Sequence, residues 1–552
     1  MRNREVVAKV NELSDGQMKA VSVGEKEILL LRIGDEFRAY ASECPHHGAP
    51  LADGALMDGK LRCPWHQAVF DALTGKRVEP PAMDDLPRFE TEVIEENVVV
   101  LLPRELPGKQ TPKMTVPDLE ADAREAVGSG EGQYHSADRF PVERLEQGRT
   151  FAIIGSGAAG MAAAEGLREE GFAGNITVLT ADEDLPYDRT DLSKRYLQKP
   201  DASSPQLRDA DFYERFGIRI ITGCEVTEID IEANRLHCDG GEDLVFDKCL
   251  IATGSQPRRL GVDGEHLDNV FTLRSLADCN AIRRRAEDAT KAVVIGGSFI
   301  GMEVAASLQQ REIDVTVVDI ADVPFEAALG SEIGKMYRTV HEEKGVTFRM
   351  GEKVDSFQGE NGSLTGVTLQ NGQTLPADLV VVGVGVAPRT AFLKGLEQKD
   401  DGSIPVDPTM RIRGQEDLFA AGDIASFPDR RTGEDIRIEH WRLAQQLGRT
   451  AARGMLGKDQ PYRGTPFFWT NQYFVITDHI GFAPHWDEIR IDGSIDDQDF
   501  LAYYLVDGQV RAMAGCGRDR QMCVAAESLQ AEELISLDTM HQAMRSGRAV
   551  RV

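Results

Sequence analysis

Short apolar runs recur through the first hundred residues, with Gly and Asp between them. The runs at 21–23, 27–33 and 98–102 are rich in Val, Leu and Ile, which favour strands. Turn-forming residues interrupt these runs every few positions. The pattern predicts a small all-β domain over residues 1–105.

The apolar pattern stops after this region. Residues 106–148 are dominated by Pro, Gly, Glu and Asp, and they have neither helical nor strand periodicity. We interpret this stretch as a linker.

A different pattern follows the linker and occurs twice. The apolar run 151–154 precedes a glycine-rich turn, a helical stretch over 161–170 and a second apolar run at 176–179. Later in the chain, the run 292–295 precedes another glycine-rich turn, a helix and the run 315–319. Strand, turn, helix and strand in this order predict two α/β domains with parallel sheets.

Each glycine-rich turn has the composition of a dinucleotide-binding loop. The first reads Gly155-Ser156-Gly157-Ala158-Ala159-Gly160, and the second reads Gly296-Gly297-Ser298-Phe299-Ile300-Gly301. In such a loop the first glycine turns the chain, the second admits a pyrophosphate and the third lets the helix pack on the strand. The phosphates lie at the helix N-terminus. Ser298 replaces the middle glycine of the second loop and is small enough to keep binding.

Acidic residues follow the second strand of each repeat. Asp182 and Glu183 come just after the first of these strands. Asp319 ends the other, and no arginine occurs at 320–322. A carboxylate here accepts a hydrogen bond from a ribose hydroxyl and repels a 2′-phosphate. The sequence therefore predicts two bound dinucleotides, the second being NADH rather than NADPH.

The β-rich region contains two cysteine–histidine pairs. They lie in Cys44-Pro45-His46-His47-Gly48 and in Cys63-Pro64-Trp65-His66. Two hairpin tips would each supply one thiolate and one imidazole, with the thiolates on one iron of a [2Fe–2S] cluster and the imidazoles on the other. Zinc binds the same set of residue types, although zinc sites usually pair Cys with Cys and His with His. The predicted metal ligands are Cys44, His46, Cys63 and His66, with structural zinc or an empty site as the alternatives.

This stretch resembles a Rieske domain, and the match continues into the flanking glycine and proline positions. High-potential members of that family carry a further cysteine in each loop and hydroxyl donors beside the cluster. His47, Trp65, Ala68 and Phe70 stand at those positions here. Fewer donors leave the reduced cluster less stabilised, so the resemblance implies a low potential.

Several segments after residue 150 carry a second family resemblance, namely 186–189, 192–194, 252–258, 383–388, 421–423, 439–441 and 468–473. Residues 150–552 resemble the FAD-dependent, NADH-linked ferredoxin reductases, which include apoptosis-inducing factor. The whole chain resembles the Rieske-containing members of this apoptosis-inducing-factor-like family.

The resemblance implies a multidomain fold. An N-terminal all-β Rieske domain would be followed by two Rossmann-like α/β domains and a C-terminal α+β domain. The expected boundaries are 1–105 for the Rieske domain, 106–148 for the linker, 149–270 with 395–465 for the FAD domain, 271–394 for the NAD domain and 466–552 for the C-terminal domain.

The same resemblance implies roles for three catalytic residues. Lys194 would lie near the flavin, where a cation stabilises the reduced ring, and Glu303 would pair with Lys194 or contact the nicotinamide. Trp469 would lie beside the flavin on the path by which electrons leave. Core packing is the alternative for Trp469 and Trp441, and a surface ion pair is the alternative for Lys194.

The resemblance also implies how FAD is held. Asp423 would hydrogen-bond the ribityl chain rather than cap a helix, and Arg189 would lie by the phosphates. Together with the glycine loops, the residues expected to bind FAD or NAD are Gly155, Gly157, Ala158, Ala159, Gly160, Asp182, Glu183, Arg189, Lys194, Val226, Thr253, Gly254, Gly296, Gly297, Ser298, Phe299, Ile300, Gly301, Glu303, Asp319, Gly385, Gly422, Asp423, Glu439, His440, Trp441 and Trp469.

Composition narrows the functional class further. The 552 residues include 62 Lys+Arg and 91 Asp+Glu, and the net charge of −29 makes nucleic-acid binding improbable. The start of the sequence lacks the features of a signal peptide, and no apolar run is long enough to span a membrane. The other cysteines are scattered without a C-x-x-C pair, which argues against a redox-active disulfide and indicates buried thiols. We expect a cytoplasmic protein, either a monomer or a homodimer.

These features predict an oxidoreductase that passes electrons from NADH through FAD to the Rieske cluster, and then to an unknown acceptor such as a protein. One alternative is a reductase that serves oxygen, a quinone or another protein directly, with the cluster as a sensor. Another is a redox-sensing interaction protein with little turnover. An oxygenase is disfavoured because no two-histidine, one-carboxylate set occurs outside the cluster loops. His479 and His485, near Asp478, lack a third ligand and are expected to be ordinary histidines.

Overall fold

The chain forms two compact units in the computed structural model. Unit 1 comprises Met1–Lys113, Arg463–Trp469 and Thr477–Val552, and unit 2 comprises Met114–Tyr462 and Thr470–Ile476. The structure describes residues 3–24, 26–103, 108, 110–114, 148–241, 243–530 and 533–550. The predicted linker lies outside the described residues, apart from 108, 110–114 and 148.

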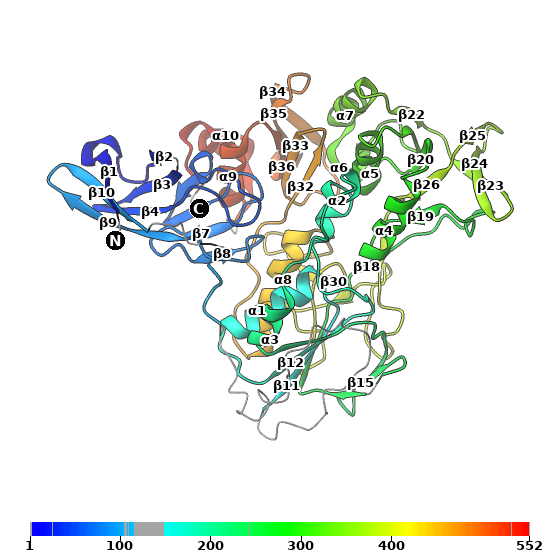
Figure 1. Ribbon diagram of the computed structural model, residues 1–552, viewed down its shortest axis with the longest axis horizontal. Helices are drawn as coiled ribbons and strands as arrows, with labels where there is room; N and C mark the ends of the chain where they lie inside the picture. The colour runs from blue at the N-terminus through cyan, green and yellow to red at the C-terminus, as the bar shows by residue number, and fades with distance from the viewer. Residues whose placement is uncertain are drawn as a thin grey trace. The chain divides into compact units, whose positions relative to one another are not determined.

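An antiparallel six-stranded sheet forms the first part of unit 1 (Figure 1), in the order β1-β10-β9-β4-β3-β2. Its strands are β1 (Asn3–Lys9), β2 (Met18–Val23), β3 (Lys26–Ile33), β4 (Glu36–Ala41), β9 (Arg88–Ile94) and β10 (Asn97–Leu102). The strands predicted at 21–23, 27–33 and 98–102 are confirmed. The apolar run in β3 is continuous because the strand is buried on both faces: Ile28 and Leu30 belong to one core cluster, and Leu29 and Leu31 to another.

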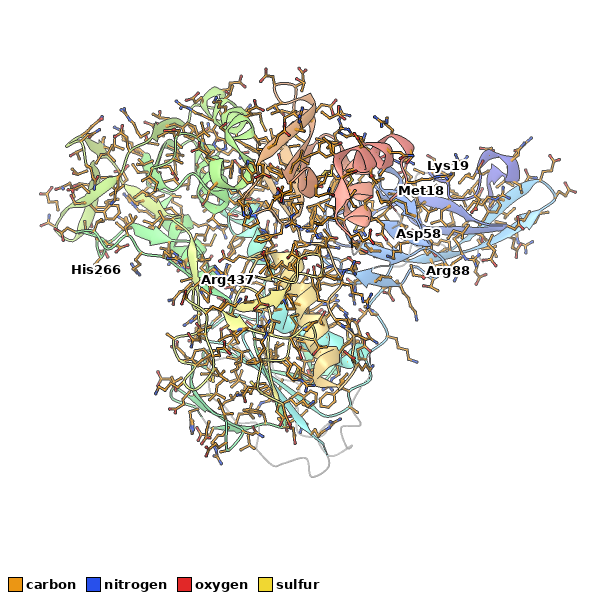
Figure 2. The ribbon with its side chains drawn as sticks, turned by 180° about the vertical axis from the view of Figure 1, so that it is seen from behind. Met18, Lys19, Asp58, Arg88, His266 and Arg437 are labelled. Carbon is orange, nitrogen blue, oxygen red and sulfur yellow. The ribbon has the colours of Figure 1, made fainter. Side chains whose placement is uncertain are left out.

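A second antiparallel sheet of unit 1 has the order β5-β6-β7-β8. Its strands are β5 (Ala55–Met57), β6 (Lys60–Arg62), β7 (Val69–Asp71) and β8 (Arg77–Glu79). Asp58, which is labelled in Figure 2, and Gly59 join β5 to β6. Their φ angles are 50° and 72°, as a two-residue type I′ turn requires. Leu61 and Phe70 from this sheet share one apolar cluster with Leu29 and Leu31, so the two sheets enclose a common core.

The last part of unit 1 is an α+β layer. Its sheet has the order β32-β33-β36-β35-β34, with β37 beside β36. The elements are β32 (Phe467–Gln472), β33 (Val475–Gly481), β34 (Glu488–Ser494), β35 (Asp499–Val506), β36 (Gln509–Cys516), α9 (Asp519–Ser528), β37 (Ile535–Ser536) and α10 (Leu537–Ser546). Leu501 and Met513 from the sheet pack against Met522 of α9 and Met540 of α10.

Unit 2 contains two parallel five-stranded sheets, ordered β13-β12-β11-β17-β29 and β22-β21-β20-β26-β19. In each sheet, the strand before the glycine loop is central. The next two strands lie on one side of it, and the chain then crosses to the other side of the central strand. Ligands bind at this reversal of strand order in doubly wound folds. The strands are β11 (Thr150–Ile154), β12 (Asn175–Leu179), β13 (Ile218–Ile221), β17 (Lys248–Ile251) and β29 (Leu418–Ala420), then β19 (Val270–Thr272), β20 (Lys291–Ile295), β21 (Asp314–Asp319), β22 (Thr347–Met350) and β26 (Leu379–Val382).

Helices cover these sheets. The main ones are α1 (Ala158–Glu169), α4 (Leu276–Arg285), α5 (Phe299–Gln309), α7 (Ser331–Glu343) and α8 (Trp441–Met455). The first begins at Ala158, earlier than the helix predicted over 161–170, because the two alanines of the glycine loop are already helical. The helices α1 and α8 lie side by side (Figure 1), and a Cβ added to Gly448 would lie 2.1 Å from the Ala159 carbonyl oxygen.

Unit 2 also contains smaller elements. They are α2 (Arg195–Gln198), α3 (Ala210–Arg215), β14 (Val226–Asp230), β15 (Arg235–Cys238), β16 (Leu244–Val245), β18 (Ser255–Pro257), α6 (Glu326–Leu329), β23 (Val354–Glu360), β24 (Ser363–Leu369), β25 (Thr374–Pro376), β27 (Val386–Pro388), β28 (Ile404–Pro405), β30 (Ala425–Pro428) and β31 (Asp435–Ile436). In the part of the chain that the structure describes, no helix has both the length and the apolar composition needed to cross a membrane.

Candidate functional site

Two turns of the same construction carry the predicted metal ligands. The Cys44 amide donates to the Ala49 carbonyl at 2.9 Å, and the Cys63 amide donates to the Ala68 carbonyl at 2.8 Å. Each turn thus closes five residues after its cysteine. The hairpin tips predicted from the sequence are formed.

The fourth residue after the cysteine has a left-handed backbone in both turns. Gly48 has a φ of 76° and Gln67 a φ of 59°. Glycine adopts this conformation without strain, whereas Gln67 is fully buried and held by its surroundings. The first turn therefore carries a glycine signature that the second lacks.

The four predicted ligands converge. The Nδ1 atoms of His46 and His66 lie 3.0 Å apart, and the thiols of Cys44 and Cys63 hydrogen-bond each other. Both thiols are buried in the core of the β sheets, while both imidazoles are half-buried. Backbone amides donate to each sulfur, those of His46 and His47 to Cys44 and those of Trp65 and His66 to Cys63. Two inner thiolates and two outer imidazoles are the donor set of a Rieske [2Fe–2S] cluster.

An aromatic ring from the C-terminal part of unit 1 covers one of these imidazoles. The ring centroids of His66 and Trp469 lie 4.3 Å apart, with the planes tilted by 45°. Trp469 lies on β32 and also packs against the core cluster that includes Phe467 and Leu501. Core packing therefore accounts for only part of its environment.

The two glycine loops of unit 2 have matching geometry. Gly155 and Gly296 have φ angles of 107° and 112°. A Cβ added to Gly160 would lie 1.9 Å from the Gly155 carbonyl oxygen, and one added to Gly301 would lie 1.9 Å from the Gly296 carbonyl oxygen. Only glycine fits at the third position of each loop, as the dinucleotide-binding pattern requires.

The middle position of each loop is the N-cap of the following helix, Gly157 for α1 and Ser298 for α5. A Cβ on Gly157 would have Arg189 as its nearest neighbour, at 3.8 Å. The Ser298 hydroxyl donates to the Gly383 carbonyl at 3.2 Å and does not cap α5. Both helix N-termini therefore keep backbone donors for a pyrophosphate, and this arrangement fits one dinucleotide at each.

The predicted ribose-binding acids have protein partners. Asp182 accepts from Tyr187 at 2.9 Å and from Arg189 at 3.2 Å, and burial raises the pKa of Tyr187 to about 12. Asp319 accepts from the amide of Gly297 and, at 2.7 Å, from the amide of Ala321. Asp319 is thereby fixed beside its glycine loop. Glu183 is exposed.

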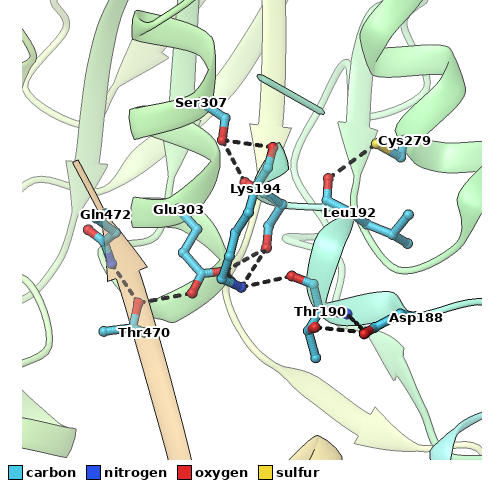
Figure 3. A network of polar contacts seen from close by, with 10 residues as sticks. Asp188, Thr190, Leu192, Lys194, Cys279, Glu303, Ser307, Thr470 and Gln472 are labelled. Carbon is cyan, nitrogen blue, oxygen red and sulfur yellow. Dashed lines mark hydrogen bonds and ion pairs between the residues drawn. The ribbon is translucent and has the colours of Figure 1, made fainter. Parts of the chain in front are cut away.

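Glu303 is the centre of a buried polar network (Figure 3). Its carboxylate accepts from Lys194 Nζ at 2.7 Å, from the Ser193 hydroxyl at 2.5 Å and from the Thr470 hydroxyl at 2.9 Å. Ser307, one turn further along α5, donates to the Ser193 carbonyl at 2.7 Å. One face of α5 thus holds the Ser193–Lys194 turn, and the pairing of Lys194 with Glu303 is confirmed.

The network continues to a buried histidine. Gln472 Nε2 donates to the Thr470 hydroxyl at 2.9 Å, and His341 Nε2 lies 2.7 Å from Gln472 Oε1. The amide oxygen can only accept, so the histidine donates through Nε2. Burial lowers the pKa of His341 to about 4 and keeps the ring neutral at neutral pH.

Polar groups near the end of β17 fit a bound flavin nucleotide. Asp423 accepts from Arg274 Nη2 at 2.7 Å, and a Cβ on Gly254 would lie 3.2 Å from the same nitrogen. Among the described residues, neither the Ser255 hydroxyl nor Arg274 Nε has a hydrogen-bond partner, although both are buried. Unpaired buried polar atoms at a strand-order reversal suit a polar ligand.

The remaining predicted binding residues occupy separate places. Val226 is buried at the start of β14 and pairs with Cys238. Gly422, with a φ of 80°, lies against Ala159 of α1. Gly385 precedes β27, Glu439 pairs with Arg437, and His440 and Trp441 begin α8. The binding roles of these residues stay predictions.

Sequence reasoning missed several contacts. Ser193, Thr470 and Gln472 lie in segments that carried the family resemblance, but nothing local indicated that they would meet Glu303. The prediction that the scattered cysteines are buried thiols is wrong for Cys238, which is half-buried. Its thiol hydrogen-bonds that of Cys224, a contact that the sequence did not indicate. Long-range pairing has no signature in residue spacing.

His479 and His485 of the C-terminal region differ in their surroundings. His479 is buried and stacks on Phe468 with ring centroids 4.6 Å apart, whereas His485 is exposed.

Comparison with known families agrees with both kinds of site. Residues 3–90 match the Rieske [2Fe-2S] domain, and residues 149–448 match the pyridine nucleotide-disulphide oxidoreductases. The Rieske match supports the predicted [2Fe–2S] cluster over the alternative of structural zinc.

Individual relatives are similar to all or part of the chain. Apoptosis-inducing factor 3 from Homo sapiens is 33% identical over 526 residues, covering 95% of this chain and 83% of the relative. The ferredoxin–NAD(+) reductase subunit of the benzene 1,2-dioxygenase system from Pseudomonas putida is 30% identical over 384 residues, covering 70% and 93%. The structure of a ferredoxin reductase from Rhodopseudomonas palustris superposes with a TM-score of 0.67 at 30% identity, covering 72% of this chain and 100% of that chain.

Two dinucleotide loops, an ion pair between Lys194 and the buried Glu303, and a convergent Cys–His set thus occur together with these similarities. The chain belongs to the pyridine nucleotide-disulphide oxidoreductase family, as a ferredoxin-reductase-like oxidoreductase that uses FAD and NAD(H) and carries a fused Rieske [2Fe–2S] domain.

Proposed function

We propose that this chain delivers electrons from NADH to its own Rieske domain, and from there to an acceptor protein. When bound, FAD accepts a hydride from NADH and the [2Fe–2S] cluster accepts single electrons. The observation that carries the proposal is the contact of His66 with Trp469, at 4.3 Å between ring centroids. A predicted cluster ligand and the predicted electron-exit residue are in contact, so the Trp469 ring leads to His66 without an intervening residue.

Lys194 supplies the positive charge in this proposal. Its ammonium group donates to the Thr190 carbonyl at 2.9 Å and to Glu303 at 2.7 Å, so its position is fixed. A fixed cation stabilises negative charge that develops on a nearby group without reorganisation. Thr470, which orients Glu303, is the residue after Trp469 on β32.

We assign the two dinucleotides by domain. FAD would be bound by residues 149–270 and 395–465, NAD by residues 271–394, and the C-terminal domain of 466–552 would complete the reductase beside the Rieske domain of 1–105. Asp319 supports NADH over NADPH, because its carboxylate is fixed at the end of β21 and repels a 2′-phosphate.

The setting of the protein forms part of the proposal. None of the eight cysteines, all of which lie in the described residues, forms a disulfide, as a reducing cytoplasm favours. The net charge of −29 opposes binding to nucleic acid and suits an onward acceptor with a basic surface, to which the chain would pass electrons as a monomer or homodimer.

Anaerobic stopped-flow mixing with NADH tests this function. Flavin absorbance and the Rieske EPR signal are followed together in the wild-type protein and in two variants, Trp469→Ala and Trp486→Ala. Trp486 lies in the same domain and packs on Tyr504 with centroids 5.1 Å apart, so it is a matched control.

We expect the cluster to be reduced after the flavin bleaches. Trp469→Ala should slow cluster reduction by about tenfold or more, equivalent to about 1.4 kcal/mol in the barrier, and Trp486→Ala should not. A wild-type protein whose flavin bleaches while its assembled cluster stays oxidised would refute the proposed function.

A further inference from the structure

Helix α9 contacts the second cluster loop directly. Cys523 Sγ donates to the Cys63 carbonyl at 3.7 Å and accepts from Gln67 Nε2 at 3.6 Å. Both Cys523 and Gln67 are fully buried. The loop that carries two predicted cluster ligands therefore rests on a helix that follows it by more than four hundred residues in the sequence.

One turn further along α9, Glu527 holds the strand that leads into this loop. Its carboxylate accepts from Arg62 Nη2 at 2.5 Å and from Lys60 Nζ at 2.9 Å. The side chains of Arg62 and Glu527 are only 3% and 11% exposed, so solvent screens this contact weakly. Burial raises the pKa of Glu527, but Arg62 and Lys60 outweigh this effect and hold it below its ordinary value.

The contact is polar and charged rather than an extension of a common core. The apolar cluster that contains Cys63 is separate from the cluster that contains Met522 of α9. A further polar contact joins Gln530 to Glu79 at 3.4 Å. Two separate cores connected by hydrogen bonds and ion pairs are typical of a specific docking interface between domains.

We propose that α9 is the docking site of the Rieske domain, with Glu527 as its main contact. The docked domain places His66 on Trp469 and so occupies the face of the C-terminal domain through which a separate ferredoxin would receive electrons. This inference rests on the proposed function for the role of Trp469. Its consequence is selectivity: electrons leave through the resident Rieske domain, and an external ferredoxin is excluded while Glu527 holds Lys60 and Arg62.

Charge variants of the interface test the inference in the intact holoprotein. Glu527→Lys places a cation opposite Lys60 and Arg62, and Glu527→Gln removes the charge at nearly constant size. The swap Arg62→Glu with Glu527→Arg, combined with Lys60→Gln so that no second cation faces the new arginine, rebuilds the pair with reversed charges. Glu488→Lys is the matched control, because Glu488 pairs with Arg490 on the exposed strand β34 of the same unit.

Hydrogen–deuterium exchange of the oxidised protein, without NADH, reports on docking alone. We expect the amides of β6 and α9 to exchange about tenfold faster in Glu527→Lys, less so in Glu527→Gln, and at the wild-type rate in Glu488→Lys. The swapped pair should restore protection. Unchanged exchange in both Glu527 variants would overturn the docking site, and Glu527→Gln provides the answer if Glu527→Lys fails to fold.

The second measurement is the NADH-dependent reduction of a separately purified [2Fe–2S] ferredoxin. Glu527→Lys should accelerate it about tenfold over the wild type, and the swapped pair should return it to the wild-type rate. Faster exchange with no gain in ferredoxin reduction would overturn the selectivity. Failure of the proposed function is distinguishable, since it would appear as an oxidised cluster in the NADH-mixed wild-type protein whatever the exchange result.

Discussion

At the scale of single residues, one glycine outside the ligand motif controls the second cluster loop. A Cβ added to Gly54 would lie 2.1 Å from the Arg62 carbonyl oxygen and 3.2 Å from Pro64 Cδ. Real contacts are never this short, so Gly54→Ala must displace the backbone on either side of Cys63. We expect this variant to lose most of its cluster, measured as bound iron and as the EPR signal after reduction with dithionite.

Gly59→Ala separates this clash from backbone strain. Gly59 has a φ of 72°, but a Cβ there would meet nothing within 4 Å. The substitution should cost about 1 kcal/mol in stability through its left-handed backbone and leave the iron content unchanged. Equal cluster loss in both variants would show that strain in the sheet, rather than contact with the loop, is responsible.

His341 gives unit 2 a pH-dependent stability. Its pKa is lowered by burial to about 4, whereas an unfolded histidine titrates near 6.5. The unfolded state therefore binds the proton more readily than the folded state. The contribution of neutral His341 to the free energy of unfolding is complete above about pH 6.5 and is lost as the pH falls towards 4. Between pH 7 and pH 5 the expected loss is about 2 kcal/mol.

The measurement is the difference in melting temperature between pH 7 and pH 5 for the wild type and His341→Gln. Glutamine can donate to Gln472 but has no proton to gain, so the variant should show a smaller difference. Identical differences in the two proteins would mean that His341 does not contribute to the acid sensitivity.

Residue chemistry could be predicted where it depends on local spacing. The candidate metal ligands could be proposed because each turn places its cysteine and histidine within four residues of each other in the sequence. The contacts of Cys523 and Glu527 with the second cluster loop and its preceding strand could not be predicted, since only the folded chain brings α9 to this loop. The same holds for His341, which meets Glu303 only through Gln472 and Thr470.

At the scale of elements, the glycine loop and its helix are one structure built twice. The N-cap positions differ, with Gly157 before α1 and Ser298 before α5. A Cβ fits at Gly157 without touching the rest of the protein closely, the nearest atom being 3.8 Å away. A single added carbon at either N-cap therefore obstructs a bound pyrophosphate more than it disturbs the fold.

Gly157→Ala and Ser298→Thr each add one such carbon. We expect Gly157→Ala to reduce the FAD content of the purified protein, measured from the flavin absorbance per chain. Ser298→Thr should keep its FAD and raise the KM for NADH about tenfold, which corresponds to about 1.4 kcal/mol. If Ser298→Thr lost FAD instead, the assignment of the two loops to two dinucleotides would be wrong.

Elements could be predicted where the pattern is local and strong. The apolar runs before both loops are strands, because parallel sheets covered on both faces produce continuous apolar segments. The start of α1 was missed, since Ala158 and Ala159 belong at once to the loop motif and to the helix. Strand order, which places β17 and β26 beside the loop-bearing strands, depends on contacts that no periodicity records.

At the scale of the whole molecule, fusion replaces diffusion between a reductase and its acceptor. A Rieske domain in the same chain meets its donor at an effective concentration set by the chain, not by the solution. Within unit 1, Glu527 and Trp469 contact this domain directly, through Arg62 and His66. Cluster reduction should therefore be unimolecular, with a rate constant that does not change over a tenfold range of protein concentration.

Mixing two defective chains separates transfer within one chain from transfer between chains. Cys63→Ser removes a predicted ligand and should leave FAD without a cluster. Gly160→Ala should leave a cluster without FAD, because its Cβ would lie 1.9 Å from the Gly155 carbonyl oxygen. In each chain the docked Rieske domain occupies Trp469. NADH added to the mixture should therefore reduce the flavin of the Cys63→Ser chain. The cluster of the Gly160→Ala chain should stay oxidised on the wild-type time scale. Cluster reduction in the mixture at the wild-type rate would instead mean that electrons pass between chains. The fused Rieske domain would then have no advantage over the Rieske domain of another chain as an acceptor.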